Sequence, residues 1–333
     1  MNKNDRAKLE KILKLNEYQL HAYLIKYLNQ KYKKPITSTV DYIVVEGDIP
    51  VCLVAHLDVV ATTPPSDVFY DHEKEIMFCI NGFGQDDRSG VFAILKLIEK
   101  GYRPHIIFTH GEEKGCIGSD ELIRRFPCAP FDLKYLIQLD RRGEKDCVFY
   151  ECDNEIFTKY VENFGFITNF GSFTDISIIA PTWKIAAVNL STGYYNEHSQ
   201  NEYLHTRALS NTIEKVENML KDIDNADYYQ YIPSYFSYEG SDYSAFEDYC
   251  DVCYRHSPSS LLHKVICRDG YTGYVCDDCY HEKFLYCPHC KIDYEVTPYD
   301  TKCPYCNREG EEHVRLYWYY WWCKQSYFAL SRI

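Results

Sequence analysis

The sequence lacks a long apolar run. No stretch approaches the roughly 20 apolar residues that a membrane-spanning helix needs, although 46% of the 333 residues are hydrophobic. The first residues, MNKNDRAKLEKILKLNEY, follow an amphipathic helix pattern and lack the apolar centre of a signal peptide. We therefore expect a soluble, cytoplasmic protein with no membrane partner.

Basic residues are also scarce. Lys and Arg number 36 against 49 Asp and Glu, which gives a formal net charge of −13. Non-specific binding to nucleic acid depends on Lys and Arg contacts to phosphate, so we expect no nucleic-acid partner. The chain has no internal repeat beyond a recurring C-x-x-C unit, and it is long enough for two domains or one large one.

Short apolar runs alternate with helical patterns over the first two thirds of the chain. Strands are expected in DYIVVEG, PVCLVAHLDVV, RPHIIFTH, LKYLIQLD and TWKIAAVNLST. Helical spacing is expected over residues 1–32 and in GVFAILKLIEKGY, SDELIRRF with Ser119 as a possible cap, NEIFTKYVENFG and TRALSNTIEKVENMLKDI. This alternation predicts an α/β sheet covered by helices on both faces.

Four regions are expected along the chain. Residues 1–225 form the α/β domain. Residues 226–249, acidic and rich in tyrosine, form a linker or an irregular covering segment, and residues 250–310 form a cysteine-rich domain. The aromatic tail 311–333 is too short to cross a membrane, so it packs on a neighbouring domain or on a second subunit.

Metal-type ligands stand at or beyond the ends of the expected strands. Open α/β sheets bind ligands beyond the carboxyl ends of their strands, where side chains far apart in sequence converge. Imidazole and carboxylate groups suit zinc or a similar divalent ion, and two ions need a shared carboxylate. Five stretches supply such groups: AHLDVV with His56 and Asp58, NGFGQDDRSG with Asp86 and Asp87, FTHGEEKGCIGSDEL with Glu112 and Glu113, LIQLDRRG with Asp140, and GYYNEHSQNEYL with His198.

Each of these stretches taken alone also has a structural explanation. A histidine at a strand end is more often packed than bound to a metal, and adjacent acidic residues beside glycine are often turns or solvated loops. The five together, in this order, favour a metal site. The set H-x-D, D-D-R-S-G, G-E-E-x-G-x-x-G-S, L-D and H-S-x-N-E resembles the co-catalytic di-zinc exopeptidase superfamily, which includes aminopeptidases, carboxypeptidases and N-acyl amino acid deacylases.

The resemblance covers about residues 40–205. It implies a zinc exopeptidase-like fold with a mixed, mostly parallel sheet, and two catalytic zinc or similar divalent ions. It also implies that Asp86 bridges the ions. The other implied ligands are His56 and Asp140 for one ion, and Glu113 and His198 for the other.

Further roles follow from the same resemblance. Asp58 would orient a ligand histidine, Glu112 would be the general base, and Asp87 would be a helix cap or a support behind the ligands. Substrate contacts are expected from the segment GSFTDIS and from the tyrosines before His198, namely Asp175 and Tyr195 or Tyr194, although a tyrosine packed at a strand end is the plainer explanation.

The implied function is hydrolysis of an amide bond in a peptide or acyl-amino-acid substrate. Only 57 residues separate Asp140 from His198, which leaves little room for an inserted lid domain and favours a single-domain, aminopeptidase-type exopeptidase. An N-acyl amino acid deacylase or a carboxypeptidase on the same site stays open. A third alternative is a zinc-ribbon adaptor with an inactive hydrolase domain.

Ten of the 16 cysteines lie after residue 249, mostly as C-x-x-C pairs. Such pairs without a secretion signal indicate metal ligation rather than disulfides. Pairing in sequence gives ribbon-like loops of 22 and 12 intervening residues, and cross-braced pairing is the alternative. Two structural zinc ions are expected as staples, and the domain offers a possible surface for a protein partner. The expected ligands are Cys250, Cys253, Cys276, Cys279, Cys287, Cys290, Cys303 and Cys306, with Cys267, His256, His263, His281 and His289 as possible replacements.

Overall fold

The computed structural model describes residues 1–61, 63–79 and 84–233, together with parts of the C-terminal region. Those parts are 247–249, 256–258, 262–266, 272–276, 279–280, 284–287, 289–290, 292–295, 302–303, 305–306 and 308. The chain divides into two compact units, Met1–Tyr235 and Phe236–Ile333. The domain boundaries expected from the sequence stay predictions, and the tail 311–333 lies outside the described residues.

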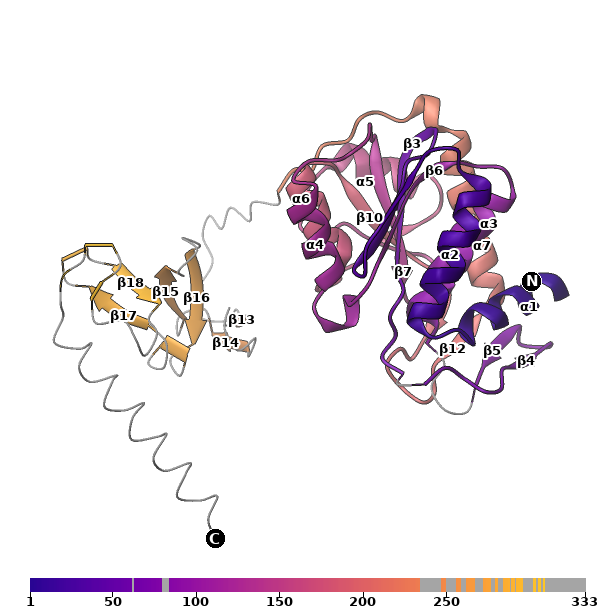
Figure 1. Cartoon of the computed structure of the whole chain (residues 1–333), viewed down its shortest axis with the longest axis horizontal. Coiled ribbons are helices and arrows are strands. Elements are labelled where there is room, and N and C mark those ends of the chain that lie inside the picture. Colours follow the sequence, from indigo (N-terminus) through magenta and orange to yellow (C-terminus); the bar gives the residue numbers. More distant parts are fainter. Residues whose placement is uncertain are drawn as a thin grey trace, which may run out of the picture. The chain divides into compact units, whose positions relative to one another are not determined.

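An eight-stranded sheet forms the centre of the first unit (Figure 1). Its order is β1-β2-β6-β3-β7-β10-β8-β9, and the neighbours β6, β3, β7 and β10 are parallel to one another. The strands are β1 (Ile36–Ser38), β2 (Tyr42–Val45), β3 (Ile49–His56), β6 (Pro104–Thr109), β7 (Tyr135–Arg141), β8 (Asp146–Val148), β9 (Ile167–Thr168) and β10 (Ala187–Ser191). The predicted α/β class with a parallel centre is confirmed.

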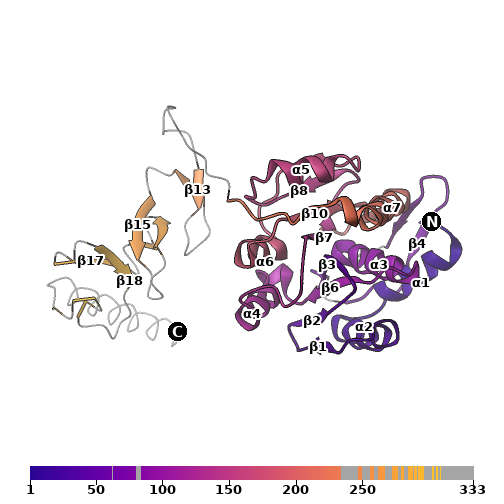
Figure 2. The ribbon, with the colours of Figure 1, turned by 90° about the horizontal axis from the view of Figure 1, so that it is seen from above.

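Helices cover both faces of this sheet (Figure 2). They are α1 (Lys3–Leu13), α2 (Glu17–Lys31), α3 (Gln85–Glu99), α4 (Ile117–Arg125), α5 (Glu155–Glu162), α6 (Asp175–Trp183) and α7 (Thr206–Lys221). Helices α4 and α6 pack on one face, and α1, α2, α3 and α7 pack on the other. The first unit also has two short 3-10 helices, η1 (Glu112–Lys114) and η2 (Ile223–Asn225).

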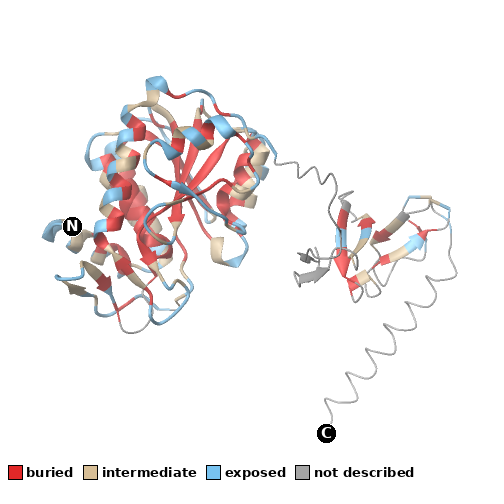
Figure 3. Ribbon diagram, turned by 180° about the vertical axis from the view of Figure 1, so that it is seen from behind, coloured by how far each residue is buried: buried red, intermediate tan, exposed pale blue. Residues whose placement is uncertain are grey.

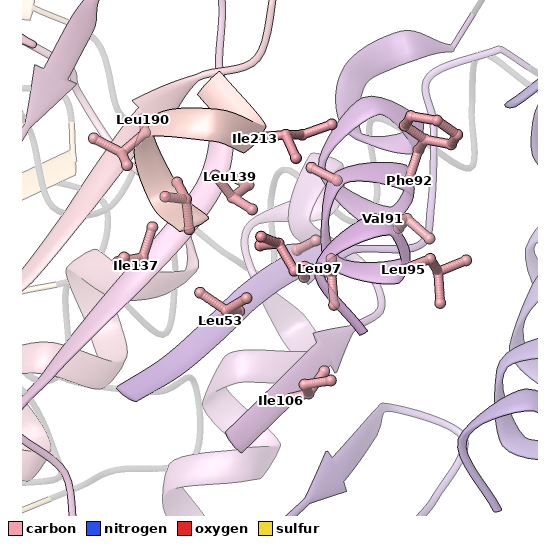
Figure 4. Close-up of a cluster of buried hydrophobic side chains, with 14 of the residues drawn as sticks. Leu53, Val91, Phe92, Leu95, Leu97, Ile106, Ile137, Leu139, Leu190 and Ile213 are labelled. Atoms are coloured by element: carbon pink, nitrogen blue, oxygen red, sulfur yellow. The ribbon is translucent and has the colours of Figure 1, made fainter. Parts of the chain in front are cut away.

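Alternation along the central strands builds two apolar layers. In β3, Leu53 faces the helices α3 and α7, whereas Val54 faces α4 and α6. The first layer continues through residues such as Ile106, Ile137 and Leu190 (Figure 4). Because both faces are covered, the central strands are buried along most of their length (Figure 3). Continuous apolar runs in the sequence reflect this burial.

Several elements differ from the sequence-based expectation. The helical pattern over residues 1–32 is broken into two helices, because Asn16 forms a capping box with Gln19 at the start of α2. Helix α4 begins before Ser119, so this serine does not cap it. The expected strand TWKIAAVNLST starts only at Ala187, since the residues before Lys184 belong to α6.

A second, smaller sheet was not predicted. Its order is β11-β12-β5-β4, and its strands are β4 (Phe69–Asp71), β5 (Ile76–Phe78), β11 (Tyr194–Tyr195) and β12 (Tyr203–His205). Strands of two or three residues are too short to show a period in the sequence. Residues 226–233, assigned above to the linker region, return to the first unit through bridges of Gln230 to Ile185 and of Pro233 to Cys152. They are therefore a covering segment at this point.

The second unit contains short antiparallel and mixed β structure. Strand β13 (Glu247–Tyr249) pairs with β14 (His256–Pro258). A four-stranded sheet has the order β16-β15-β18-β17, with β15 (Leu262–Ile266), β16 (Thr272–Cys276), β17 (Phe284–Cys287) and β18 (Ile292–Glu295). Across the described residues of the whole chain, none of the helices has the length and apolar character to span a membrane.

Candidate metal centre

Asp86 lies between two pairs of metal-type ligands. Its Oδ1 is 3.0 Å from Nε2 of His56, and that nitrogen is 3.5 Å from Oδ1 of Asp140. Its Oδ2 is 3.2 Å from Nε2 of His198, and that nitrogen is 3.0 Å from Oε2 of Glu113. The structure therefore brings the five expected ligands together, with each oxygen of Asp86 facing a different pair.

The fold explains why residues so distant in sequence meet. His56 ends β3, Asp140 lies near the end of β7, and η1 follows β6. These strands are parallel neighbours, so their carboxyl ends share one edge of the sheet. Asp86 reaches the same edge at the start of α3. His198 comes from the loop 196–202 between β11 and β12, where its φ is +60°.

Asp58 connects the end of β3 to the turn that carries the two glutamates. Its Oδ1 accepts the N–H of Glu112 at 3.1 Å, and its Oδ2 accepts the N–H of Glu113 at 3.2 Å. Nδ1 of His56 lies 3.4 Å from Oδ1 of Asp58 but 3.1 Å from the main-chain oxygen of the same residue. The carboxylate thus fixes the turn, while the carbonyl is the nearer partner of the histidine.

Two glycines shape that turn. Gly111 has a φ of +71° and Gly115 a φ of +91°, a region in which residues with a side chain are strained. Between them, Glu112 and Glu113 form η1. The side chain of Glu113 reaches His198, whereas the main-chain N–H groups of both glutamates point at Asp58. Adjacent glutamates can therefore have different neighbours.

Asp140 is held by three side chains whose supporting role was not predicted from the sequence. Gln138 donates to its Oδ2 at 2.9 Å, and Thr174 donates to the same oxygen at 3.0 Å. The hydroxyl of Tyr194 donates to Oδ1 at 3.3 Å. Because Oδ2 is held in this way, Oδ1 is the oxygen that faces His56. The contact of Gln138 with Asp140 could have been predicted from the sequence, because residues two positions apart on a strand have side chains on the same face.

Glu202 is a further residue to which no role was assigned. Its carboxylate is 4% exposed and accepts the N–H groups of Gly84 at 2.8 Å, Gln85 at 2.7 Å and Asp86 at 3.1 Å. It stands at the last position of the H-S-x-N-E stretch. That stretch also contains His198, so one short segment supplies a metal-type ligand and a main-chain anchor.

Asp87 occupies a supporting position behind the ligands. It is fully buried, and its Oδ2 accepts the N–H of His56 at 3.3 Å. Its Oδ1 accepts the N–H of Gly90 at 2.9 Å within α3. One carboxylate oxygen of each of Asp87 and Asp140 also lies within 4.8 Å of a ring nitrogen of His56. Asp87 thereby joins the end of β3 to the first turn of α3.

The two expected substrate contacts are not joined to the ligands in the same way. Asp175 is fully buried and accepts the hydroxyls of Thr109, at 2.6 Å, and of Ser119. Both of its oxygens are engaged inside the protein, and its expected contact with substrate stays a prediction. Tyr195 stacks on Tyr203 with ring centroids 5.1 Å apart, and its role stays a prediction.

The electrostatics of the centre reflect crowded carboxylates in a buried space. Burial lowers the pKa of His56, but Asp140 and hydrogen bonds with Asp58 and Asp86 raise it well above its ordinary value. Burial, reinforced by the charge of Asp86, raises the pKa of Asp140 to about 7. Burial likewise raises the pKa of Glu112 to about 9. A dense set of carboxylate and imidazole donors of this kind fits divalent cations.

A cavity of about 250 Å³ adjoins the segments around Asp58 and Asp86. Val59, Gly84 and Arg88 line it together with Leu13 and Pro64. Val59 directly follows Asp58, and Gly84 precedes Asp86 by two positions. The residues that line this space include sequence neighbours of Asp58 and Asp86, and none of the five expected ligands lines it.

A second ligand cluster lies in the second unit. The Sγ atoms of its four cysteines lie within 4.8 Å of one another, with 3.7 Å between those of Cys287 and Cys306 and 3.9 Å between those of Cys290 and Cys303. The third and fourth C-x-x-C pairs therefore meet, as sequential pairing requires, and the cross-braced alternative does not apply to them. Cys276 and Cys279 are buried. Their expected partners Cys250 and Cys253 lie outside the described residues, as do Cys267 and His281.

Neither a family model nor a curated protein sequence matches the chain. Solved structures with a similar fold do match. They include aminopeptidase PepT from Bacillus cereus, with 13% identity over 66% of this chain and 98% of that chain and a TM-score of 0.51. A tripeptidase from Staphylococcus aureus shows 13% identity over 66% and 98% of the two chains, with a TM-score of 0.52. A TET aminopeptidase from a marine-sediment Thaumarchaeota archaeon shows 11% identity over 67% and 99%, with a TM-score of 0.53. The chain is therefore similar in fold to structures named as aminopeptidases and a tripeptidase.

Proposed function

We propose that the chain is a metal-dependent hydrolase that cleaves an amide bond, of the aminopeptidase kind. The observation that carries the proposal is the position of Asp86, whose two oxygens face His56 with Asp140 and His198 with Glu113. A carboxylate shared by two ligand pairs is what a hydrolase centre for two ions requires.

In this proposal zinc is the ion at both positions. One ion would be held by His56, Asp86 and Asp140, and the other by Asp86, Glu113 and His198. Bound there, the ions supply an acidified water and a polarised substrate carbonyl. The supports described above serve to present one chosen oxygen or nitrogen of each ligand, and such outer contacts tune metal sites strongly.

Glu112 is the proposed general base. It accepts a proton from the attacking water and donates it to the leaving amine, which needs a carboxyl group held next to the ligands without being one of them. Burial raises the pKa of Glu112 in the ion-free protein, and cations held by the neighbouring ligands would lower it so that the carboxylate can accept the proton. The Asp58 contact to its N–H, at 3.1 Å, fixes the backbone from which the side chain extends. Glu113 on the same turn is bound to His198, so the two glutamates divide the roles of proton carrier and ligand.

The names of the similar structures support a peptide with a free N-terminus as the substrate. The 57 residues between Asp140 and His198 leave little room for a lid domain, which also favours this branch over an N-acyl deacylase or a carboxypeptidase. The cytoplasmic location and a protein partner for the cysteine-rich domain stay predictions.

The test uses the purified full chain and the variant Glu112→Gln. We expect the variant to retain its metal content, because Glu112 is not a ligand, and to lose hydrolysis of aminoacyl, acyl-amino-acid and dipeptide substrates by roughly 100- to 10,000-fold. The matched control is Glu121→Gln, which changes an exposed glutamate that pairs with Arg124 in α4. Control and wild type should hydrolyse the same substrates equally.

Two outcomes would count against the proposal. If wild type and Glu112→Gln behave alike across the whole panel, the enzyme proposal fails and the adaptor alternative gains. If only acyl-amino-acids or only peptides with a free carboxylate next to the cleaved bond react, the hydrolase stands and the aminopeptidase assignment fails.

A further inference from the structure

Glu202 binds the main chain at the start of α3. Its Oε2 accepts the N–H of Gly84, and its Oε1 accepts the N–H groups of Gln85 and Asp86. Asp86 and Asp87 have non-helical backbone angles, so these N–H groups lie in an irregular segment that leads into the regular part of α3. Buried main-chain N–H groups need acceptors, and one carboxylate supplies an acceptor to all three. Glu202 thus caps this segment from a different part of the chain.

This cap joins the two segments that form one half of the metal centre. Asp86 follows directly from the capped N–H groups, and His198 lies four residues before Glu202 in the loop 196–202. His198 is itself half exposed, and within the described residues its ring pairs with Asp86 and Glu113. Its place relative to Asp86 therefore depends on how the loop is held.

The other half of the centre has supports of its own. His56 lies in β3 and contacts Asp58, and Asp140 lies in β7 and is held by Gln138 and Thr174. None of these contacts passes through the loop 196–202. A change in Glu202 therefore acts mainly on the pair formed by Glu113 and His198.

We propose that Glu202 is a positioning residue that sets the affinity of the ion site formed by Asp86, Glu113 and His198, with less effect on the site formed by His56 and Asp140. The inference rests on the proposed function, because it assumes two ion sites that share Asp86. Glu202 acts through the main chain at Asp86 and through the loop that carries His198, and it contacts no ion itself.

The test compares Mn²⁺ binding by wild type, Glu202→Gln and Glu197→Gln, each as the full chain with its cysteines loaded with zinc. Mn²⁺ suits carboxylate-rich sites, whereas thiolate sites favour zinc, so the titration reports on the first unit. The glutamine at 202 retains one acceptor oxygen and places an N–H₂ group against a main-chain donor. Glu197 is the matched control, because it lies in the same loop and its carboxylate pairs with Arg142 at 2.9 Å instead of with α3.

We expect two Mn²⁺ affinities in wild type, of which Glu202→Gln weakens one by about 10- to 100-fold and the other by less than about threefold. Glu197→Gln should match wild type at both sites. Thermal unfolding of the ion-free proteins shows whether a variant is folded, and Glu202→Asp, which keeps the charge, replaces Glu202→Gln if the latter does not fold.

Three results would overturn the inference. Unchanged affinities in Glu202→Gln would show that the cap does not position the site, with the proposed function intact. Equal weakening of both sites together with a lower thermal midpoint would show a general structural role. If wild type bound no Mn²⁺, and no zinc beyond that held by its cysteines, the proposed function would fail and the inference would fail with it.

Discussion

Replacing Asp58 by Asn tests whether this buried carboxylate serves to anchor the η1 turn or to hold the metal ligands. Asp58 is 3% exposed, and its two oxygens each accept one main-chain N–H of the η1 turn. An asparagine of the same shape retains one acceptor and turns an N–H₂ group towards the other donor. The main-chain oxygen of residue 58, which is 3.1 Å from Nδ1 of His56, is unaffected by the substitution.

The size of the effect follows from the contacts that are lost. A hydrogen bond to a charged acceptor contributes roughly 1.5–3 kcal/mol. If the displaced turn misplaces Glu112 in the transition state, this loss lowers kcat/KM by roughly 10- to 100-fold. Affinity at the ion site that contains His56 should change less than activity does, because the carbonyl of Asp58 still holds that ring in place.

The assay measures kcat/KM on the best substrate of wild type and metal affinity by titration, for Asp58→Asn and for the control Asp146→Asn. Asp146 is a carboxylate on β8 that accepts a side-chain N–H from Asn169 and pairs with Arg141, so its partners are not proposed ligands. Full activity in Asp58→Asn would refute the argument that the turn must be anchored. A loss of metal affinity that accounts for all of the lost activity would show that Asp58 acts through the ligands His56 and Glu113 instead.

Two further predictions concern zinc and pH. Cys303→Ser should lower the zinc content of the chain by one ion and leave the hydrolysis measured above unchanged, because Cys303 lies in the four-cysteine cluster of the second unit; unchanged zinc content would contradict that cluster as a site. Burial lowers the pKa of His105 to about 4, so the folded state favours the neutral ring. The unfolded chain binds a proton at the ordinary pKa of about 6.5. The free energy of unfolding is therefore fully retained above about pH 6.5 and falls as the pH drops towards about 4. In His105→Asn, whose amide oxygen can still accept the N–H of Gly47, the thermal midpoint should fall less steeply between pH 6.5 and 4, and an equal slope in both proteins would contradict this explanation.

The central strands and the meeting of the ligands could be predicted because both depend on short-range patterns. Continuous apolar runs mark β3, β6 and β7, and each run ends in a polar group that parallel pairing brings to a common edge. The two small residues at 111 and 115 likewise indicate the turn that carries Glu112 and Glu113.

The supports of the site were harder to predict. Thr174 and Glu202 reach their partners across long sequence separations, and a single sequence contains no signal for such pairings. The small sheet of β4, β5, β11 and β12 has strands too short for a period. The helix α6 was missed because it contains Pro181 and continues into residues that were read as a strand.

The two ligand clusters differ in how much chain must be organised before an ion can bind. The four cysteines from Cys287 to Cys306 close a short loop, so an ion can gather them while the rest of the chain is still unfolded. The ligands from His56 to His198 meet only after the parallel sheet and the small second sheet have formed. During biosynthesis, scarce zinc would therefore impair the folding of the second unit, whereas the first unit would fold without its ions and bind them afterwards.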